Sequence, residues 1–506
     1  MSDPFFTRKR KRGPPRSGRP IKPPSRQEEP SEDIEDEEIT DPETSDEELP
    51  DADTEGSRTT VESDNASRDS DDEEFANETA TEKRRRLAQQ YLENLQTELS
   101  VDGFDARDVD KDILAARLQE DVAEDQGRLY RFLTNSFFFV HPARKFLSYK
   151  GMLSPTGIAG AENILYTVSK DRTLAKWDAT TAKRLKFKRG DHDKEIVCIA
   201  VSSDGKFIAT GGKDRKINIY NPELDLLKTF TQHRDSVMCL AFRRGTHQLY
   251  SGSADRTVKS WSLDALSYVE TLFGHQDAIN DISALAQERC ITTGSRDRTV
   301  RLWKIVEESQ LIFRGGGPTS SHKLRFVEGS IDVVAMVDHH IFVTGSDNGT
   351  LSLWTLQRKK PAYSVHLAHG LDTQLTPEAY TAETLQFPTA PRPQPRWITC
   401  VAALPYADIV VSGSWGGIKV WRVVCEDTDR SDVNGVLAGG KRKQYSLDFV
   451  AEFKLPGVVN GVTLLENGKD EIRICAAVGR ELRGGRWMRR DSKNGVHILT
   501  VKKKSE

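Results

Sequence analysis

The chain has 506 residues and a formal net charge of -4. This length is sufficient for a large folded core with extensions. No apolar run approaches the roughly 20 residues of a membrane-spanning helix, and the first residues lack the apolar stretch of a secretory signal peptide. We therefore expect no membrane anchor and no secretion.

Charge is distributed unevenly along the N-terminal part of the chain. Residues 1–26 contain nine Lys or Arg and one acidic residue, whereas residues 27–82 contain 25 Asp or Glu and two Arg. Such a segment cannot bury enough apolar surface to offset its chain entropy, so residues 1–81 are predicted to be disordered. The basic cluster at residues 8–12 is typical of a nuclear-import signal or a polyanion contact.

A helical extension is predicted over residues 82–135, because apolar residues recur there at the spacing of one helical face in two stretches. The first stripe consists of Leu87, Tyr91, Leu95 and Leu99. The second consists of Leu114, Leu118, Val122 and Leu129. Two isolated helices cannot form a core of their own, so we expect them to pack on the following domain or on a partner.

From about residue 136 the pattern changes to short strands with glycine-rich turns, and one phrase recurs three times. Each copy has a histidine, a hydroxyl-bearing residue, a turn aspartate 22 residues after the histidine, and an aromatic residue. The copies comprise His192, Thr210, Asp214 and Tyr220; His233, Ser251, Asp255 and Trp261; and His275, Thr293, Asp297 and Trp303. The three aspartates are 41 and 42 residues apart, and a period of about 40–45 residues with this signature is typical of four-stranded propeller blades.

Four degenerate copies extend the pattern on either side, three of them marked by Trp177, Trp354 and Trp421 and the last spanning about residues 457–501. The sequence therefore predicts an all-β, seven-bladed WD-repeat β-propeller over residues 136–506, preceded by the disordered acidic tail and two short helices. Insertions are predicted at about 314–328, 366–395 and 426–446. Whether residues 137–140 or 496–501 supply the ring-closing strand is left open.

The repeated Ser/Thr, His and Asp resemble a hydrolase triad, but we favour a structural role. The same set recurs in successive copies, whereas an active site is normally singular. A buried carboxylate requires hydrogen-bond donors, and the histidine supplies one. No nucleophile elbow, phosphate loop or paired metal ligands appear, and the six cysteines include no C-x-x-C pair. We therefore expect a protein that is not an enzyme and that holds no metal and no cofactor.

Residues 136–506 contain 53 Lys or Arg against 40 Asp or Glu, which suggests a polyanionic partner such as nucleic acid. Cations near the turn aspartates are expected to face a partner on one rim of the ring: Lys170, Arg172, Lys213, Arg215, Arg256, Arg296 and Arg298. A second basic cluster contains Arg480, Arg483, Arg486, Trp487, Arg489 and Arg490. Arginine forks and an aromatic ring suit phosphates and an unstacked base, so this cluster is predicted to contact RNA. A solvated edge is the alternative interpretation of each set.

Several motifs lie outside the generic repeat, at residues 83–95, 110–124, 313–316, 328–334 and 368–370. On these motifs, the chain resembles the WD-repeat family specific to the U3 small nucleolar ribonucleoprotein over roughly residues 83–500. The resemblance implies an RNA-binding scaffold that binds box B/C of U3 small nucleolar RNA and acts in pre-18S ribosomal RNA processing. It also implies a location in the nucleus, within the nucleolus. It also implies a kink-turn-binding protein of the same particle and other small-subunit processome proteins as partners, with a single copy per particle.

Two other classes remain open from the residues themselves, a histone-binding or chromatin-assembly propeller and a ubiquitin-ligase substrate receptor. A histone reader should present an acidic groove, and the excess of basic residues over 136–506 argues against one. A substrate receptor should co-purify with ligase subunits and dissociate from RNA-rich particles in mild salt.

Overall fold

The computed structural model describes residues 129–315, 326–372, 393–431, 437–468, 470–486 and 489–504, without the side chains of 426–443. The predicted tail and the predicted helices up to residue 128 lie outside these ranges. Within them, the helical structure is limited to η1, a 3-10 helix at Thr134–Ser136, and the rest of the regular structure is strand. No helix of the described part is long and apolar enough to cross a membrane.

Five sheets repeat one pattern of four consecutive antiparallel strands. The first has β2 (Pro155–Ala161), β3 (Ile164–Ser169), β4 (Thr173–Asp178) and β5 (Lys183–Arg189). The second has β6 (Ile196–Val201), β7 (Ile208–Gly212), β8 (Ile217–Tyr220) and β9 (Leu226–Phe230). The third has β10 (Val237–Phe242), β11 (Gln248–Ser253), β12 (Thr257–Ser262) and β13 (Ser267–Phe273). The fourth has β14 (Ile279–Ala284), β15 (Arg289–Gly294), β16 (Thr299–Lys304) and β17 (Ser309–Arg314), and the fifth has β18 (Ile331–Asp338), β19 (Ile341–Ser346), β20 (Leu351–Thr355) and β21 (Tyr363–Val365).

The sixth sheet has six strands in the order β1-β26-β25-β24-β23-β22. Its strands are β1 (Phe137–Leu147), β22 (Cys400–Ala403), β23 (Ile409–Ser431), β24 (Leu437–Asn467), β25 (Glu471–Gly479) and β26 (Gly495–Lys503). The all-β architecture is as predicted, but the prediction of seven blades is wrong, because the described strands form six sheets. A count of sequence signatures assigns one sheet to each repeat, whereas hydrogen-bond pairing decides where a sheet ends.

Strand β24 is the reason that the last two predicted repeats share one sheet. It pairs with β23 up to Val458 and with β25 from Val458 onward, without a turn between the two parts. Gly457 precedes this changeover with φ 116°, and a Cβ atom there would lie 2.5 Å from Ser492 Oγ. Glycine therefore permits a bend in a strand that stays continuous.

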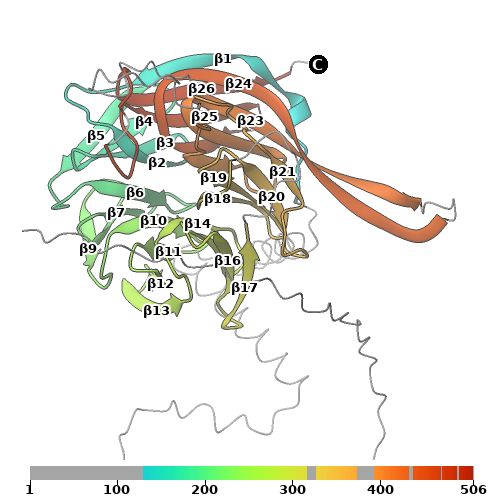
Figure 1. Cartoon of the computed structure of the whole chain (residues 1–506). Helices are drawn as coiled ribbons and strands as arrows, with labels where there is room; N and C mark the ends of the chain where they lie inside the picture. Colours follow the sequence, from blue (N-terminus) through green and yellow to red (C-terminus); the bar gives the residue numbers. More distant parts are fainter. Residues whose placement is uncertain are drawn as a thin grey trace, which may run out of the picture. The chain divides into compact units, whose positions relative to one another are not determined.

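The ring of sheets is closed by the two candidate segments together. β1 lies antiparallel to β26, with Leu147 opposite Val496, so the N-terminal strand forms the outer edge of the C-terminal sheet (Figure 1). The first strands of successive sheets contact one another in the order β2, β6, β10, β14, β18, β22, and β24 completes the circle by contacting both β22 and β2. This closure leaves no free inner edge.

Strands near the ring axis are buried, and strands far from it are exposed. In the second sheet, β6, β7 and β8 are buried almost throughout, because neighbouring sheets cover both of their faces. Outermost strands such as β5 and β9 are largely exposed. Apolar residues therefore fill both faces of the inner strands, and charged residues concentrate on the outer ones.

The predicted insertion at 426–446 is mostly paired strand. The β23–β24 pairing continues from Cys425 opposite Tyr445 to Ser431 opposite Leu437, and Figure 1 shows the two strands extending beyond the sheets. Backbone hydrogen bonds thus order a polar segment that the composition alone describes as a loop. The other two predicted insertions fall largely on residues 316–325 and 373–392, outside the described residues.

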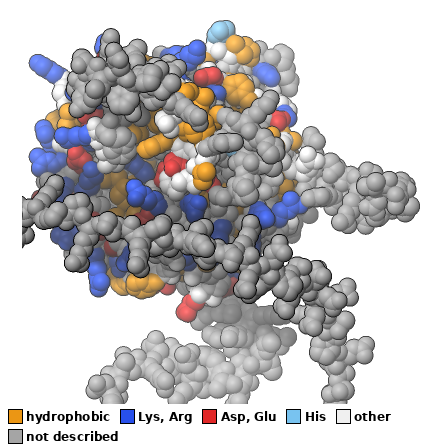
Figure 2. Space-filling view, in the orientation of Figure 1, with side chains coloured by type: hydrophobic (Ala, Val, Ile, Leu, Met, Phe, Trp, Pro, Cys, Tyr) orange, Lys and Arg blue, Asp and Glu red, His pale blue; other side chains and the backbone are white. Residues whose placement is uncertain are grey.

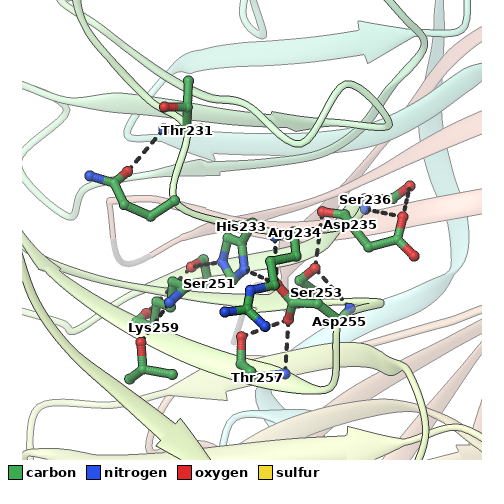
Figure 3. A network of polar contacts seen from close by, with 12 residues as sticks. Thr231, His233, Arg234, Asp235, Ser236, Ser251, Ser253, Asp255, Thr257 and Lys259 are labelled. Carbon is green, nitrogen blue, oxygen red and sulfur yellow. Dashed lines mark hydrogen bonds and ion pairs between the residues drawn. The ribbon is translucent and has the colours of Figure 1, made fainter.

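A hydrogen-bond network connects the strands of the third sheet at one end of the blade (Figure 3). His233 Nδ1 lies 2.9 Å from Asp255 Oδ2, and its Nε2 lies 2.8 Å from Ser251 Oγ. The Trp261 indole donates to the same Ser251 oxygen at 2.8 Å. In the second sheet His192 makes the corresponding contacts, at 2.9 Å to Asp214 Oδ2 and 2.8 Å to Thr210 Oγ1.

The fourth sheet uses a different threonine from the predicted one. His275 Nε2 lies 2.8 Å from Thr292 Oγ1, and Trp303 donates to that oxygen at 2.8 Å, whereas Thr293 donates at 3.5 Å to the carbonyl of Asp281. Relative to the third sheet, the turn between the first two strands is one residue shorter and the next turn is one residue longer. The two changes in turn length cancel, so the spacing from His275 to Asp297 stays at 22 residues. This spacing therefore does not reveal that the bonded threonine lies one position earlier.

The network keeps the turn aspartates charged. Burial by itself would raise the pKa of Asp297, but His275, the backbone N–H of Thr299 and the Thr299 hydroxyl outweigh it and lower the pKa to about 2. The same opposition between burial and hydrogen bonding lowers the pKa values of Asp214 and Asp255. Each carboxylate is thus a permanent acceptor that fixes the turn.

We predict that Thr292→Val destabilises the protein more than Thr293→Val. The first change leaves the buried His275 and Trp303 without their shared partner and should cost about 1–3 kcal/mol. The second removes a long hydrogen bond and should cost less than about 1 kcal/mol. Urea unfolding of both variants measures the difference, and equal losses would contradict the observed register.

Candidate nucleic-acid interface

Four rim arginines occupy the same position in successive turns. Their backbones are left-handed, with φ of 63° at Arg172, 68° at Arg215, 70° at Arg256 and 53° at Arg298. The preceding aspartate stabilises the turn, as where Asp255 Oδ1 accepts the backbone N–H of Thr257 at 3.0 Å. All four side chains are exposed. The turn therefore presents an arginine outward at regular intervals around the rim.

The rim arginines differ in what surrounds them. Arg172 donates to the carbonyl of Asp193 at 3.4 Å. Arg215, Arg256 and Arg298 form no ion pair with any described residue. Arg256 also lines a pocket of about 380 Å³ together with Arg234. These three arginines are accessible donors for a phosphate.

The rim lysines are instead engaged by acids of the protein itself. Lys170 is 5% exposed, with its Nζ 3.2 Å from Glu481 Oε2 and 2.9 Å from the carbonyl of Gly485. Burial lowers the pKa of Lys170, and Glu481 opposes that shift. Lys213 Nζ lies 2.8 Å from Glu195 Oε2. Arg296 is exposed and forms no ion pair within the described ranges.

The second predicted cluster lies in the β25–β26 loop, residues 480–494, and most of its arginines are also engaged. Arg486 is 69% exposed and pairs with Glu195 at 3.2 Å and with Glu481 at 3.8 Å. Arg490 pairs with Asp372. Arg480 Nε donates to the carbonyl of Ser492 at 2.6 Å. Arg489 is exposed without an ion pair to a described residue, and Trp487 lies outside the described residues.

Shared acids join the two predicted basic sets into one surface. Glu195 is paired by Lys213 and Arg486, and Glu481 by Lys170 and Arg486. Burial would raise the pKa of Glu195, but Lys213, Lys170 and Arg486 lower it overall. The β25–β26 loop is therefore held on the rim by ion pairs, and part of the positive charge expected there is neutralised.

Arg483 does not face outward with the rest of its cluster. Its Nη2 donates to the carbonyl of Asn280 in β14 at 3.1 Å. Its charge also influences groups on five inner strands, namely Cys198, Cys239, Asp281, Asp332 and Cys400. The guanidinium therefore lies near the ring axis, where its charge offsets those of Asp281 and Asp332.

Asp281 is the most perturbed of these acids. Burial raises its pKa to about 6, although Arg483 and the backbone N–H groups of Val334 and Ile282 lower it. Its Oδ2 accepts the Val334 N–H at 3.0 Å. Burial likewise raises the pKa of Asp332, which accepts a hydrogen bond from Asn280 at 2.8 Å. Two acids and one arginine thus form a charged cluster inside the ring.

The repeated Asp-His-Ser sets do not form accessible nucleophiles. Ser251 is fully buried, and its oxygen is shared between His233 and the Trp261 indole. Among the described residues, no three His, Cys, Asp or Glu side chains are arranged to hold a metal ion. The sets connect strands, and their hydroxyl-bearing residues Thr210, Ser251 and Thr292 are buried.

The sequence-based predictions omitted a strongly basic outer strand. β5 carries five Lys or Arg among its seven residues, interrupted by Leu185 and Phe187, and it is exposed almost throughout. In Figure 2, Lys and Arg side chains gather along the left side, where Figure 1 places β5 and β9. The density of basic residues in residues 183–189 is a sequence signal that could have identified this surface.

Comparison with known proteins identifies the family. The family model described as "WD domain, G-beta repeat" matches residues 184–221, 224–262 and 266–304. Ribosomal RNA-processing protein 9 of Saccharomyces cerevisiae is 35% identical, over 85% of this chain and 90% of its own length. U3 small nucleolar RNA-interacting protein 2 of Homo sapiens is 34% identical, over 84% of this chain and 83% of its own. The chain belongs to the family of U3 small nucleolar RNA-interacting WD-repeat proteins.

Further matches agree with this family and with the resemblance seen in the sequence, which is confirmed. An uncharacterized WD repeat-containing protein of Schizosaccharomyces pombe is 41% identical over 81% of this chain and 82% of its own. The solved structure "Crystal structure of RRP9 WD40 repeats" matches with a TM-score of 0.59 at 35% identity, over 71% of this chain and 99% of that one. The family's WD-repeat fold is therefore shared by the described sheets.

We predict that Asp281 contributes less to the stability of the protein as pH rises from about 4 to 6. Its folded pKa lies above its unfolded value, so the native state binds more protons across this window and this contribution is lost as the pH increases. Asp332 acts in the same direction, whereas His369, whose pKa burial lowers to about 3, acts in the opposite direction in this window. The turn aspartates also act in the opposite direction, at lower pH.

Asp281→Asn removes this titration, so the unfolding free energy of the variant relative to that of the wild type should rise by up to about 3 kcal/mol between pH 4 and pH 7. Urea unfolding at several pH values between 4 and 7 measures the slope. An unchanged slope in the variant would contradict the raised pKa. Asp470→Asn, at an exposed position where the side chain forms no ion pair with a described residue, serves as the control.

Proposed function

We propose that this protein is an RNA-binding scaffold subunit of the U3 small nucleolar ribonucleoprotein, which binds box B/C of U3 small nucleolar RNA for pre-18S ribosomal RNA processing. The observation that carries the proposal is the similarity over 84–85% of the chain to relatives named for U3 RNA interaction or ribosomal RNA processing. It extends well beyond the residues that match the generic repeat.

The surface chemistry supports contact with RNA. Arg215, Arg256 and Arg298 project from equivalent turns, and Arg489 adds an exposed cation in the β25–β26 loop. A rigid ring with such donors contacts phosphates and overall RNA shape more readily than base edges. Binding should therefore weaken as salt concentration rises.

The proposal includes the particle in which the protein acts. A kink-turn-binding protein of the same particle would hold the RNA in a folded form, and other small-subunit processome proteins would contact the remaining surfaces. The protein acts there as a single copy in the nucleolus, without catalysis. The burial of the repeated hydroxyl groups supports a structural role for these residues.

The histone-binding and ubiquitin-ligase alternatives have weaker support. A histone reader requires an acidic docking surface, whereas the acids Glu195, Glu481 and Asp372 are engaged by cations of the protein itself. Two of the relatives described above carry names that refer to U3 RNA or ribosomal RNA processing.

Crosslinking in cells followed by sequencing of the attached RNA tests the proposal. We expect U3 small nucleolar RNA to be enriched, with crosslinks at box B/C. Enrichment of ligase subunits or nucleosomes without U3 RNA would overturn it.

We predict that Arg215→Ala combined with Arg489→Ala weakens binding to U3 RNA in the presence of the kink-turn-binding protein. Removing two phosphate contacts should lower affinity roughly tenfold and reduce the salt slope by about two. Arg480 and Arg486 are left intact because they support the loop, through Ser492 and through Glu195 and Glu481 respectively. Fluorescence anisotropy at several salt concentrations measures both quantities.

The matched control is Lys359→Ala with Lys360→Ala, which removes the same charge from an exposed turn between β20 and β21. Equal effects of the two double variants would show that only net charge matters and would remove this patch from the interface.

A further inference from the structure

A groove of about 760 Å³ lies between the outer strand β1 of the sixth sheet and the outer strand β5 of the first. One side is formed by Phe146 and the segment after it, and the other by Arg184, Phe187 and Arg189 of β5. Its lining includes Phe146, Tyr149, Lys150, Arg184, Phe187 and Arg189. The volume is within the range of about 300–1,000 Å³ that small-molecule sites occupy.

The positive charge of this groove is not neutralised by the protein. Arg184, Arg189 and Lys150 form no ion pair with any described residue. Asp171 is the single acid in the lining, and its carboxylate already accepts the Tyr149 hydroxyl at 2.8 Å and the Thr173 backbone N–H at 3.3 Å. This arrangement differs from the β25–β26 loop, where Arg486 and Arg490 are held by carboxylates.

Two aromatic rings, those of Tyr149 and Phe187, orient the guanidinium group of Arg184. The Arg184 guanidinium carbon lies 5.5 Å from the centroid of the Tyr149 ring and 4.8 Å from that of Phe187. These distances are typical of cation–π contacts, which orient a guanidinium without neutralising it. Phe187 is 55% exposed and Phe146 is 43% exposed, although both flank the groove. Exposed aromatic surface beside an unpaired arginine suggests a ligand with a planar face and an anionic backbone.

Single-stranded RNA has both of these features. An unstacked base can lie on a phenylalanine ring or on the plane of an arginine, while neighbouring phosphates contact arginine forks. The bases of an A-form duplex remain stacked and cannot reach the rings. An acidic peptide would pair with the cations but would not require the exposed ring surfaces of Phe187 and Phe146.

We propose that the β1–β5 groove binds a single-stranded nucleotide segment of RNA, with phosphates on Arg184 and Arg189 and a base against Phe187. This inference rests on the proposed function, because it assigns a second contact to the same class of partner. The groove belongs to the outer surface of the ring and shares no residue with the β25–β26 loop.

Binding of a fluorescein-labelled oligouridylate to the full-length protein tests the groove. We compare wild type, Arg184→Ala with Arg189→Ala, and Phe187→Ala. The double arginine variant should lose roughly tenfold in affinity and about two units of salt slope. Phe187→Ala should lose several-fold in affinity with an unchanged salt slope, because stacking is not ionic.

The control is Lys228→Ala with Arg314→Ala, which removes two exposed cations from the outer strands β9 and β17. Thermal melts should be unchanged in every variant, since all of these positions are exposed.

Ultraviolet crosslinks should map to the peptide around residues 183–189 in the wild type. Affinities equal to those of the control variant, or competition by oligoglutamate with no effect of Phe187→Ala, would overturn the proposal.

Co-precipitation of U3 RNA from cells separates this inference from the proposed function. If the groove variants bind oligouridylate normally while U3 RNA still co-precipitates with wild type, the groove assignment fails and the function stands. If U3 RNA does not co-precipitate with wild type, the proposed function fails irrespective of the groove.

Discussion

The antiparallel pairing of β1 with β26 is the interaction on which the rest of the structure depends. It joins strands that are more than 300 residues apart in the chain and makes the N-terminal strand part of the C-terminal sheet. Once this sheet is complete, β24 can pack against β2, and every inner strand has a neighbour on both sides. The buried residues of the inner strands, the charged cluster around Arg483 and the alignment of the rim turns all require this closure.

Closure also determines which charges are available to a partner. The β25–β26 loop extends from the last sheet onto the rim of the first two, where Glu481 reaches Lys170 and Arg486 reaches Glu195. Such pairs fix the loop, and their exposed members contribute little to stability in water. Cations that have acidic partners are less available to phosphates, so accessible charge is concentrated at the rim arginines and on β5.

The β1–β5 groove follows from the same constraint. Phe146 and Tyr149 come from the strand that closes the ring and the segment after it, whereas Arg184, Phe187 and Arg189 belong to the first complete sheet. Neither group forms a groove by itself. Their proximity explains how a surface with ring faces and unpaired guanidinium groups arises between β1 and β5. This surface is separate from the loop that carries the other arginines.

Periodicity in the sequence determined much of the architecture, because each repeat encodes its own turn and hydrogen-bond set. The positions of His192, His233 and His275, the exposed arginines after the turn aspartates, and the family follow from local spacing and motif. Tertiary structure decided the rest, since pairing between distant strands is not encoded in local spacing. The continuity of β24 reduced seven predicted blades to six sheets, compensating turn lengths placed Thr292 where Thr293 was predicted, and packing directed Arg483 inward. The same reason applies to charge: composition gives the number of cations, whereas the fold decides which of them have an acid within ion-pair distance.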